Sequence, residues 1–97
     1  MAYSIVYKAR AEQDIWETAD HLSDHSMPAT VKFLQTVKKR IEALIDMPLT
    51  CPKISPHQDY RKMVVGKYVV LYIVNEHTKE ILVMRVVHGK RNYQSEL

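Results

Sequence analysis

The sequence has little of what several common protein classes require. Its one cysteine, Cys51, cannot form an intrachain disulfide, and its two glycines belong to no glycine-rich phosphate loop. No apolar run approaches the roughly 20 residues that span a bilayer, and the N-terminus lacks a basic segment followed by an apolar one. We therefore expect a protein of the reducing cytoplasm, neither secreted nor inserted into a membrane.

The residue sets of familiar catalytic centres are also missing from the sequence. There is no Ser/His/Asp array and no evident pair of carboxylates. Four histidines lack the spacing of metal ligands, namely His21, His25, His57 and His77. We therefore expect neither a metal nor a cofactor.

Length and charge limit the remaining possibilities. Ninety-seven residues suffice for one modest hydrophobic core, so we expect a single domain over residues 1–97. The net charge is +3, but residues 10–25 carry one cation and five anions, whereas residues 53–97 carry eight cations and four anions. The basic half would attract a polyanion such as nucleic acid, although many soluble domains carry a similar net charge.

Apolar spacing in the first half predicts one strand and two helices. Residues 3–8 alternate and are rich in β-formers, which indicates a strand. Residues 9–24 place apolar side chains on one helical stripe, with Trp16 at its margin, and we expect Trp16 in the core. A second helix follows Ser26, which suits its N-cap, and ends at Met47.

The second half predicts a proline-rich loop and three strands. Residues 48–59 hold three prolines and no periodicity. Residues 60–65 and 67–75 predict a hairpin around Gly66, and residues 80–88 predict a last strand after a polar turn. The expected fold is therefore α+β with the order β-α-α-β-β-β, an antiparallel sheet packed on an N-terminal helical hairpin.

Side chains alternate along a strand, so the sequence also predicts two different sheet faces. If the helices cover the face that carries Leu71 and Met84, a mixed basic, aromatic and apolar face stays open. A chain of this length has no further element to cover that face, which predicts a macromolecular partner. The candidate residues for partner binding, on this face and just beyond its last strand, are Lys62, Tyr68, Tyr72, Arg85, Lys90 and Arg91.

The element order, the run YRKMVVGKYVVLYIV and the ending RVVHGKRNY resemble the RelE/ParE superfamily of toxins from bacterial type II toxin–antitoxin systems. The resemblance extends from Tyr3 to about Tyr93. It implies a cytoplasmic toxin that forms a hetero-oligomeric complex with an antitoxin encoded beside it. RelE-like members cleave mRNA on the ribosome without a metal, whereas ParE-like members inhibit DNA gyrase.

Some positions match the nuclease branch of this superfamily. Arg61 matches the basic position at the start of the second strand, and the run 89–91 matches the GKR segment after the last strand, with Tyr93 close behind. If the chain is a nuclease, the resemblance and the chemistry of metal-free RNA cleavage imply an acid, a base and cations around the phosphate. The candidate catalytic residues are then His88, Arg91, Tyr93, Arg61 and Arg85.

Other positions depart from the nuclease branch. Val69 stands where nuclease members commonly carry an arginine, and Met63 stands where they carry a second lysine. The ending RVVHGKR is closer to ParE-like members. The resemblance therefore favours gyrase inhibition over mRNA cleavage, and a third alternative is a toxin relic that binds only its antitoxin.

Each candidate residue also has a structural interpretation. His88 could be a hydrogen-bonded residue at a strand end, and Arg85, in mid-strand, must find a carboxylate, a carbonyl or a ligand. The other cations could be solvated charges at the sheet edge, which discourage aggregation. Tyr68 and Tyr72 could stabilise the sheet as cross-strand pairs, although we favour contact with a partner.

Overall fold

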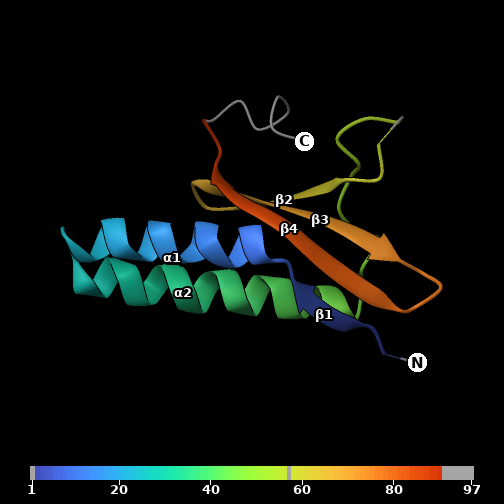
Figure 1. Ribbon diagram of the computed structural model, residues 1–97, viewed down its shortest axis with the longest axis horizontal. Coiled ribbons are helices and arrows are strands. Elements are labelled where there is room, and N and C mark those ends of the chain that lie inside the picture. Colours follow the sequence, from blue (N-terminus) through green and yellow to red (C-terminus); the bar gives the residue numbers. More distant parts are fainter. Residues whose placement is uncertain (1, 57, 91–97) are drawn as a thin grey trace.

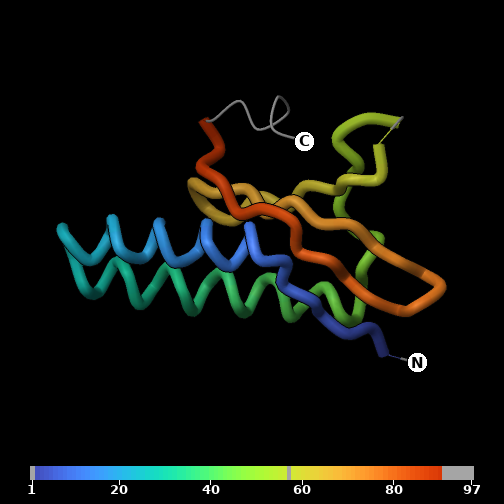
Figure 2. Tube along the Cα trace, in the orientation of Figure 1, coloured from blue at the N-terminus to red at the C-terminus, as the bar shows by residue number. Residues whose placement is uncertain are grey.

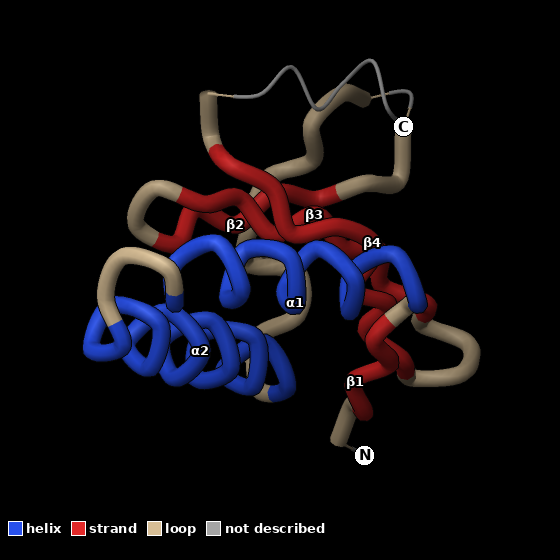
Figure 3. Tube along the Cα trace, turned by 60° about the vertical axis from the view of Figure 1, so that its left-hand side comes forward, coloured by secondary structure: helices blue, strands red, loops and turns tan. Residues whose placement is uncertain are grey.

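The computed structural model, which describes residues 2–56 and 58–90, places two long helices against one face of a four-stranded sheet (Figures 1 and 3). The order of elements agrees with the predicted β-α-α-β-β-β. The elements are β1 (Ser4–Tyr7), α1 (Ala9–Ser23), α2 (Met27–Glu42), a 3-10 helix η1 (Ala43–Ile45), β2 (Arg61–Val65), β3 (Tyr68–Asn75) and β4 (Glu80–His88). None of the described helices is both long and apolar enough to cross a bilayer.

Helix α2 begins where the sequence predicts it. The Ser26 side chain accepts a hydrogen bond from the Ala29 N–H at 3.2 Å, which caps the helix. Phe33, Val37 and Ile41 follow at spacings of four residues and are all buried. This apolar stripe packs on the sheet and anchors the helical hairpin to it.

Helix α1 differs from its prediction at Trp16. The Trp16 side chain is 74 % exposed, so its expected place in the core is wrong. Asp14 is buried instead, on the same stripe as Ala11, and Ile15 packs at the edge of the core. Residues 11, 14, 15 and 22 share one side of the helix, and Trp16 projects beyond it.

The sheet has the strand order β1-β4-β3-β2. Strands β2, β3 and β4 pair antiparallel, but β1 pairs parallel with β4, with Ile5 opposite Ile81. The chain trace shows β1 beside the first part of β4 (Figure 2). The sheet is therefore mixed rather than wholly antiparallel, because alternation along a strand specifies its two faces but not its neighbour or direction.

The face that the helices cover is the opposite of the one expected. Val70 and Tyr72 of β3 lie in the main core with residues of α2, whereas Leu71 belongs to a separate cluster on the other side. Strand β4 has a bulge, because Tyr72 pairs with Val83, Leu71 pairs with Arg85, and Met84 has no partner between them. The extra residue shifts the alternation, so that residues on both sides of it reach the helix-covered face.

The face away from the helices is not bare. Val69, Leu71 and Val87 form a second buried cluster, and Ile54 and Tyr60 pack against it. Both of these residues belong to the loop between η1 and β2, which rises beside the sheet on the side away from the helices (Figure 1). The proline-rich loop thus covers part of the face that was expected to stay open, while Val64 on the same face is 58 % exposed.

Candidate functional site

Arg85 is held inside the molecule by an ion pair with Asp14 of α1. Its Nε donates to Asp14 Oδ2 at 2.7 Å and its Nη2 donates to Oδ1 at 3.2 Å. Oδ2 also accepts the backbone N–H of Val86 at 3.0 Å. Both side chains are buried, and Arg10 approaches the same carboxylate from the surface at 3.7 Å. Arg85 therefore does not line an open face, and its carboxylate partner lies 71 residues away.

Arg61 fastens the proline-rich loop to the sheet. Its Nη1 donates to the Cys51 carbonyl at 2.7 Å and approaches the Leu49 carbonyl at 3.4 Å. The backbone N–H of Lys62 donates to the Pro52 carbonyl at 3.1 Å. The guanidinium of Arg61 is thus engaged with main-chain oxygens of the loop.

Tyr72 lies in the core and has no exposed surface. Its hydroxyl donates to the Pro48 carbonyl at 3.1 Å, which ties the same loop to β3. Burial raises the pKa of the Tyr72 phenol well above its usual range, and the nearby Cys51 thiol acts in the same direction, whereas Arg61 acts against it. The expected position of Tyr72 on an open face is therefore wrong.

Tyr72→Phe is expected to change how stability depends on pH. In the unfolded chain the phenol ionises near pH 10, whereas in the folded protein it stays protonated, so its contribution is complete below pH 10 and is lost as the pH rises. At pH 7 the free energy of unfolding of the wild type should exceed that of the variant by about 1 kcal/mol, from the hydrogen bond to Pro48. Above pH 10 this difference should fall by up to about 1.4 kcal/mol per pH unit. Urea unfolding of both proteins between pH 7 and 11 measures this difference. If the two stabilities changed in parallel with pH, the prediction would be wrong.

Tyr68 and His88 meet at one end of the sheet. They face each other across β3 and β4, and their rings lie edge to face at 5.6 Å between centroids. The Tyr68 ring is partly buried and also meets Phe33 of α2 at 4.8 Å. His88 is exposed, and its Nδ1 accepts the backbone N–H of Lys90 at 3.2 Å. In the neutral imidazole this bond leaves the ring proton on Nε2.

Two basic side chains lie near His88 on one side, whereas Asp14 and Glu17 of α1 line a separate hollow on another side of it. Lys67, His88, Gly89 and Lys90 line a shallow hollow of about 260 Å³. The Gly89 N–H donates to the Lys67 carbonyl at 2.8 Å, which holds the β2–β3 turn against the end of β4. We call Lys67, His88 and Lys90 the basic end. It presents cationic donors that can contact a phosphate or a carboxylate.

The structure brings together some of the predicted residues and separates others. His88, Lys90 and Tyr68 gather at the basic end, whereas Arg61 and Arg85 make internal contacts elsewhere. Lys62 pairs with Leu71 and so lies on the face opposite Tyr68. Arg91 and Tyr93 lie outside the described residues.

Lys67 was not among the predicted site residues. The hairpin register could have identified it, because pairing Tyr68 with His88 places Lys67 beside Gly89. Within residues 2–56 and 58–90, no cluster of three or more His, Cys, Asp or Glu side chains could hold a metal ion.

Comparisons with known proteins identify the family of this chain. Residues 5–93 match the model of the ParE toxin of type II toxin–antitoxin systems, parDE. No curated protein sequence matches significantly. Because the matched residues make up most of the chain, the chain belongs to this family.

Solved structures share the fold. A chain from the chromosomal ParDE toxin–antitoxin system of P. aeruginosa is 18 % identical, with a TM-score of 0.75 over 89 % of this chain and 95 % of that one. The isolated RelE toxin of E. coli is 18 % identical, with a TM-score of 0.66 over 98 % and 94 % of the two chains. A chain of the intact RelBE complex of E. coli is 17 % identical, with a TM-score of 0.65 over 93 % and 100 %. Sequence, fold and family model agree: this chain is a toxin of the ParE family, within the RelE/ParE superfamily of type II toxin–antitoxin systems.

Proposed function

We propose that this toxin stops growth by inhibiting DNA gyrase and that an antitoxin encoded beside it neutralises it. Similar folds occur in the ParDE system of P. aeruginosa and in the RelBE toxin–antitoxin complex of E. coli, which supports an antitoxin as partner. The match to the ParE family model supports the gyrase branch.

The preference for gyrase inhibition over mRNA cleavage rests on the residues at the positions that are basic in the nuclease branch. Met63 and Val69 occupy two of them, and both are buried core residues, 4 % and 5 % exposed. Arg61 keeps its positive charge but directs it at loop carbonyls. A chain with this arrangement has fewer cations free to neutralise a pentavalent phosphate, whereas inhibition by binding needs no hydrolytic centre.

The test uses purified gyrase and the purified toxin without its antitoxin. We expect loss of DNA supercoiling and accumulation of gyrase-dependent DNA breaks as toxin is added, with relief when the product of the adjoining reading frame is present. Intact supercoiling at a large molar excess of folded toxin would refute the gyrase target.

The basic end supports a second candidate, ribosome-dependent cleavage of mRNA. His88 is exposed, carries its neutral-state proton on Nε2 and lines the same hollow as Lys67 and Lys90, so it could transfer a proton beside a bound phosphate. Primer-extension mapping in a translating extract tests this alternative. Endonucleolytic cuts that disappear in His88→Ala and Arg91→Ala would favour the nuclease, whereas unchanged growth on expression without antitoxin would indicate a relic.

A further inference from the structure

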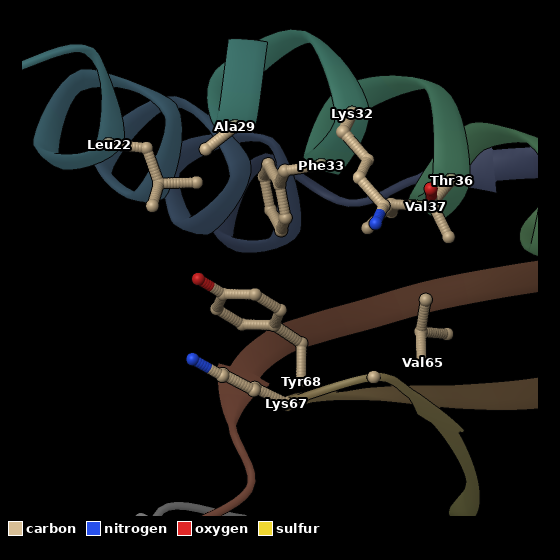
Figure 4. A pocket seen from close by; sticks show the side chains of 10 residues that line it. Leu22, Ala29, Lys32, Phe33, Thr36, Val37, Val65, Lys67 and Tyr68 are labelled. Atoms are coloured by element: carbon tan, nitrogen blue, oxygen red, sulfur yellow. The ribbon is translucent and has the colours of Figure 1, made fainter. Parts of the chain in front are cut away.

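A groove lies between α2 and the β2–β3 turn, next to the basic end (Figure 4). It has a volume of about 310 Å³. Phe33 reaches from α2 toward the Tyr68 ring, and the two rings meet edge to face at 4.8 Å (Figure 4). The described residues that line the groove are Leu22, Ala29, Lys32, Phe33, Thr36, Val37, Val65, Gly66, Lys67 and Tyr68.

The charges of this groove all have one sign. Lys32 on α2 and Lys67 in the turn are exposed and stand on its two walls, and no carboxylate occurs among the described lining residues. Arg40 extends the row, since positions 32, 36 and 40 follow one another at single helical turns on α2. The groove therefore combines an apolar floor with a cationic rim, which complements an apolar side chain flanked by carboxylates.

The nearby edge of β2 is already occupied at two points. The Lys62 N–H donates to the Pro52 carbonyl at 3.1 Å, and the Val64 carbonyl accepts from Arg40 Nη2 at 3.3 Å. A bound segment therefore cannot pair with β2 as a continuous added strand without displacing these contacts. It must be recognised through its side chains in the groove.

A nucleic-acid base would fit this groove poorly. Aliphatic and aromatic side chains make up most of its walls, and the neutral hydrogen-bonding side chains among the described lining residues are Thr36 and Tyr68. A base would leave most of its polar edge unpaired there, which opposes binding. An apolar side chain has no such groups to satisfy.

We propose that the Phe33–Tyr68 groove holds an acidic segment of the antitoxin, which packs one apolar side chain against the paired rings and places Asp or Glu residues against Lys32 and Lys67. This inference rests on the proposed toxin–antitoxin function and specifies where the antitoxin is recognised. The groove adjoins the basic end, so a segment bound there would also restrict access to His88.

Overlapping peptides that span the product of the adjoining reading frame provide the probe. Their binding to the full-length toxin is measured by fluorescence anisotropy. We expect the tightest peptide to carry an apolar residue flanked by carboxylates, and the Lys32→Glu/Lys67→Glu double variant to bind it at least about tenfold more weakly. Replacing those carboxylates with lysine in the peptide should restore binding to the double variant.

One matched variant controls this experiment and another tests the groove independently of charge. Lys53→Glu changes the charge of an exposed residue beside the opposite end of β2 and should alter affinity less than about twofold. Ala29→Trp fills the groove from an exposed position on α2 and should also weaken binding about tenfold, with an unchanged melting temperature. Equal affinity of all these variants for the peptide would overturn the proposal.

Further outcomes separate this inference from the function on which it rests. Gyrase inhibition is measured with the toxin alone. If the toxin inhibits gyrase but peptide binding is unaffected by the changes at Lys32 and Lys67, only the groove proposal is overturned. Peptide binding with the expected charge dependence would support the groove even if gyrase stays active. Saturable binding of a single-stranded RNA that requires both lysines, without peptide binding, would overturn the proposal in favour of nucleic acid.

Discussion

Asp14→Ala is expected to lower the free energy of unfolding by about 3–5 kcal/mol, because it leaves the buried guanidinium of Arg85 without its carboxylate. The same change removes the acceptor of the Val86 N–H. Loss of the carboxylate that pairs with Arg85 and loss of a buried main-chain hydrogen bond both lower the free energy of unfolding. Urea unfolding at neutral pH, followed by circular dichroism, measures the change.

Two controls show whether this loss comes from the buried pair. Arg10→Ala removes the outer cation, whose side chain is 48 % exposed, and should cost at most about 1 kcal/mol. Asp14→Leu combined with Arg85→Met removes both buried charges and should be far more stable than Asp14→Ala alone. A loss below about 1 kcal/mol in Asp14→Ala would show that water or another group replaces the carboxylate.

The position of this ion pair affects how toxicity data are interpreted. It joins α1 to the part of β4 that leads to His88, since Asp14 binds both Arg85 and the next main-chain N–H. A variant at Arg85 that loses toxicity therefore does not by itself identify a contact with gyrase or RNA. Its folded fraction must be measured beside its activity.

Tyr72→Ala is expected to lower the free energy of unfolding by about 3–5 kcal/mol, because the Tyr72 ring is fully buried between the sheet and the helices. The variant also loses the hydrogen bond that joins β3 to the Pro48 carbonyl. Tyr72→Phe keeps most of the ring volume and should lose only about 1 kcal/mol. The comparison by urea unfolding separates packing from the hydroxyl.

Val64→Ala is the surface control for this prediction. Val64 lies on β2 and is 58 % exposed, so truncation should change stability by less than about 1 kcal/mol. If Tyr72→Ala instead kept wild-type stability and lost only antitoxin binding, the residue would act at a surface, and its assignment to the core would be wrong.

Much of the fold could be predicted because the signals are local. Ser26 caps α2 as expected, and Gly66 adopts a φ of +60° in the predicted hairpin turn, a conformation that glycine reaches without steric cost. Asn75 supports the next turn by accepting the N–H groups of His77 and Thr78. Each of these signals acts within a few residues.

Less of the candidate site could be predicted. Its basic side chains are close in sequence to the end of β4 or to the hairpin turn, so His88 and Lys90 were identified. The buried roles of Arg85 and Tyr72 depend on Asp14 and Pro48, which are 71 and 24 residues away. No spacing rule connects such partners.

The sequence by itself determined the helices, strands and turns of this toxin, because hydrophobic periodicity and capping residues act over single turns and strands. Only the tertiary structure decided which sheet face the helices cover, that β1 runs parallel to β4, and that Met84 shifts the alternation of β4. The reason is that alternation defines two faces and leaves open which of them is buried. That choice depends on the combined packing of both helices and the proline-rich loop.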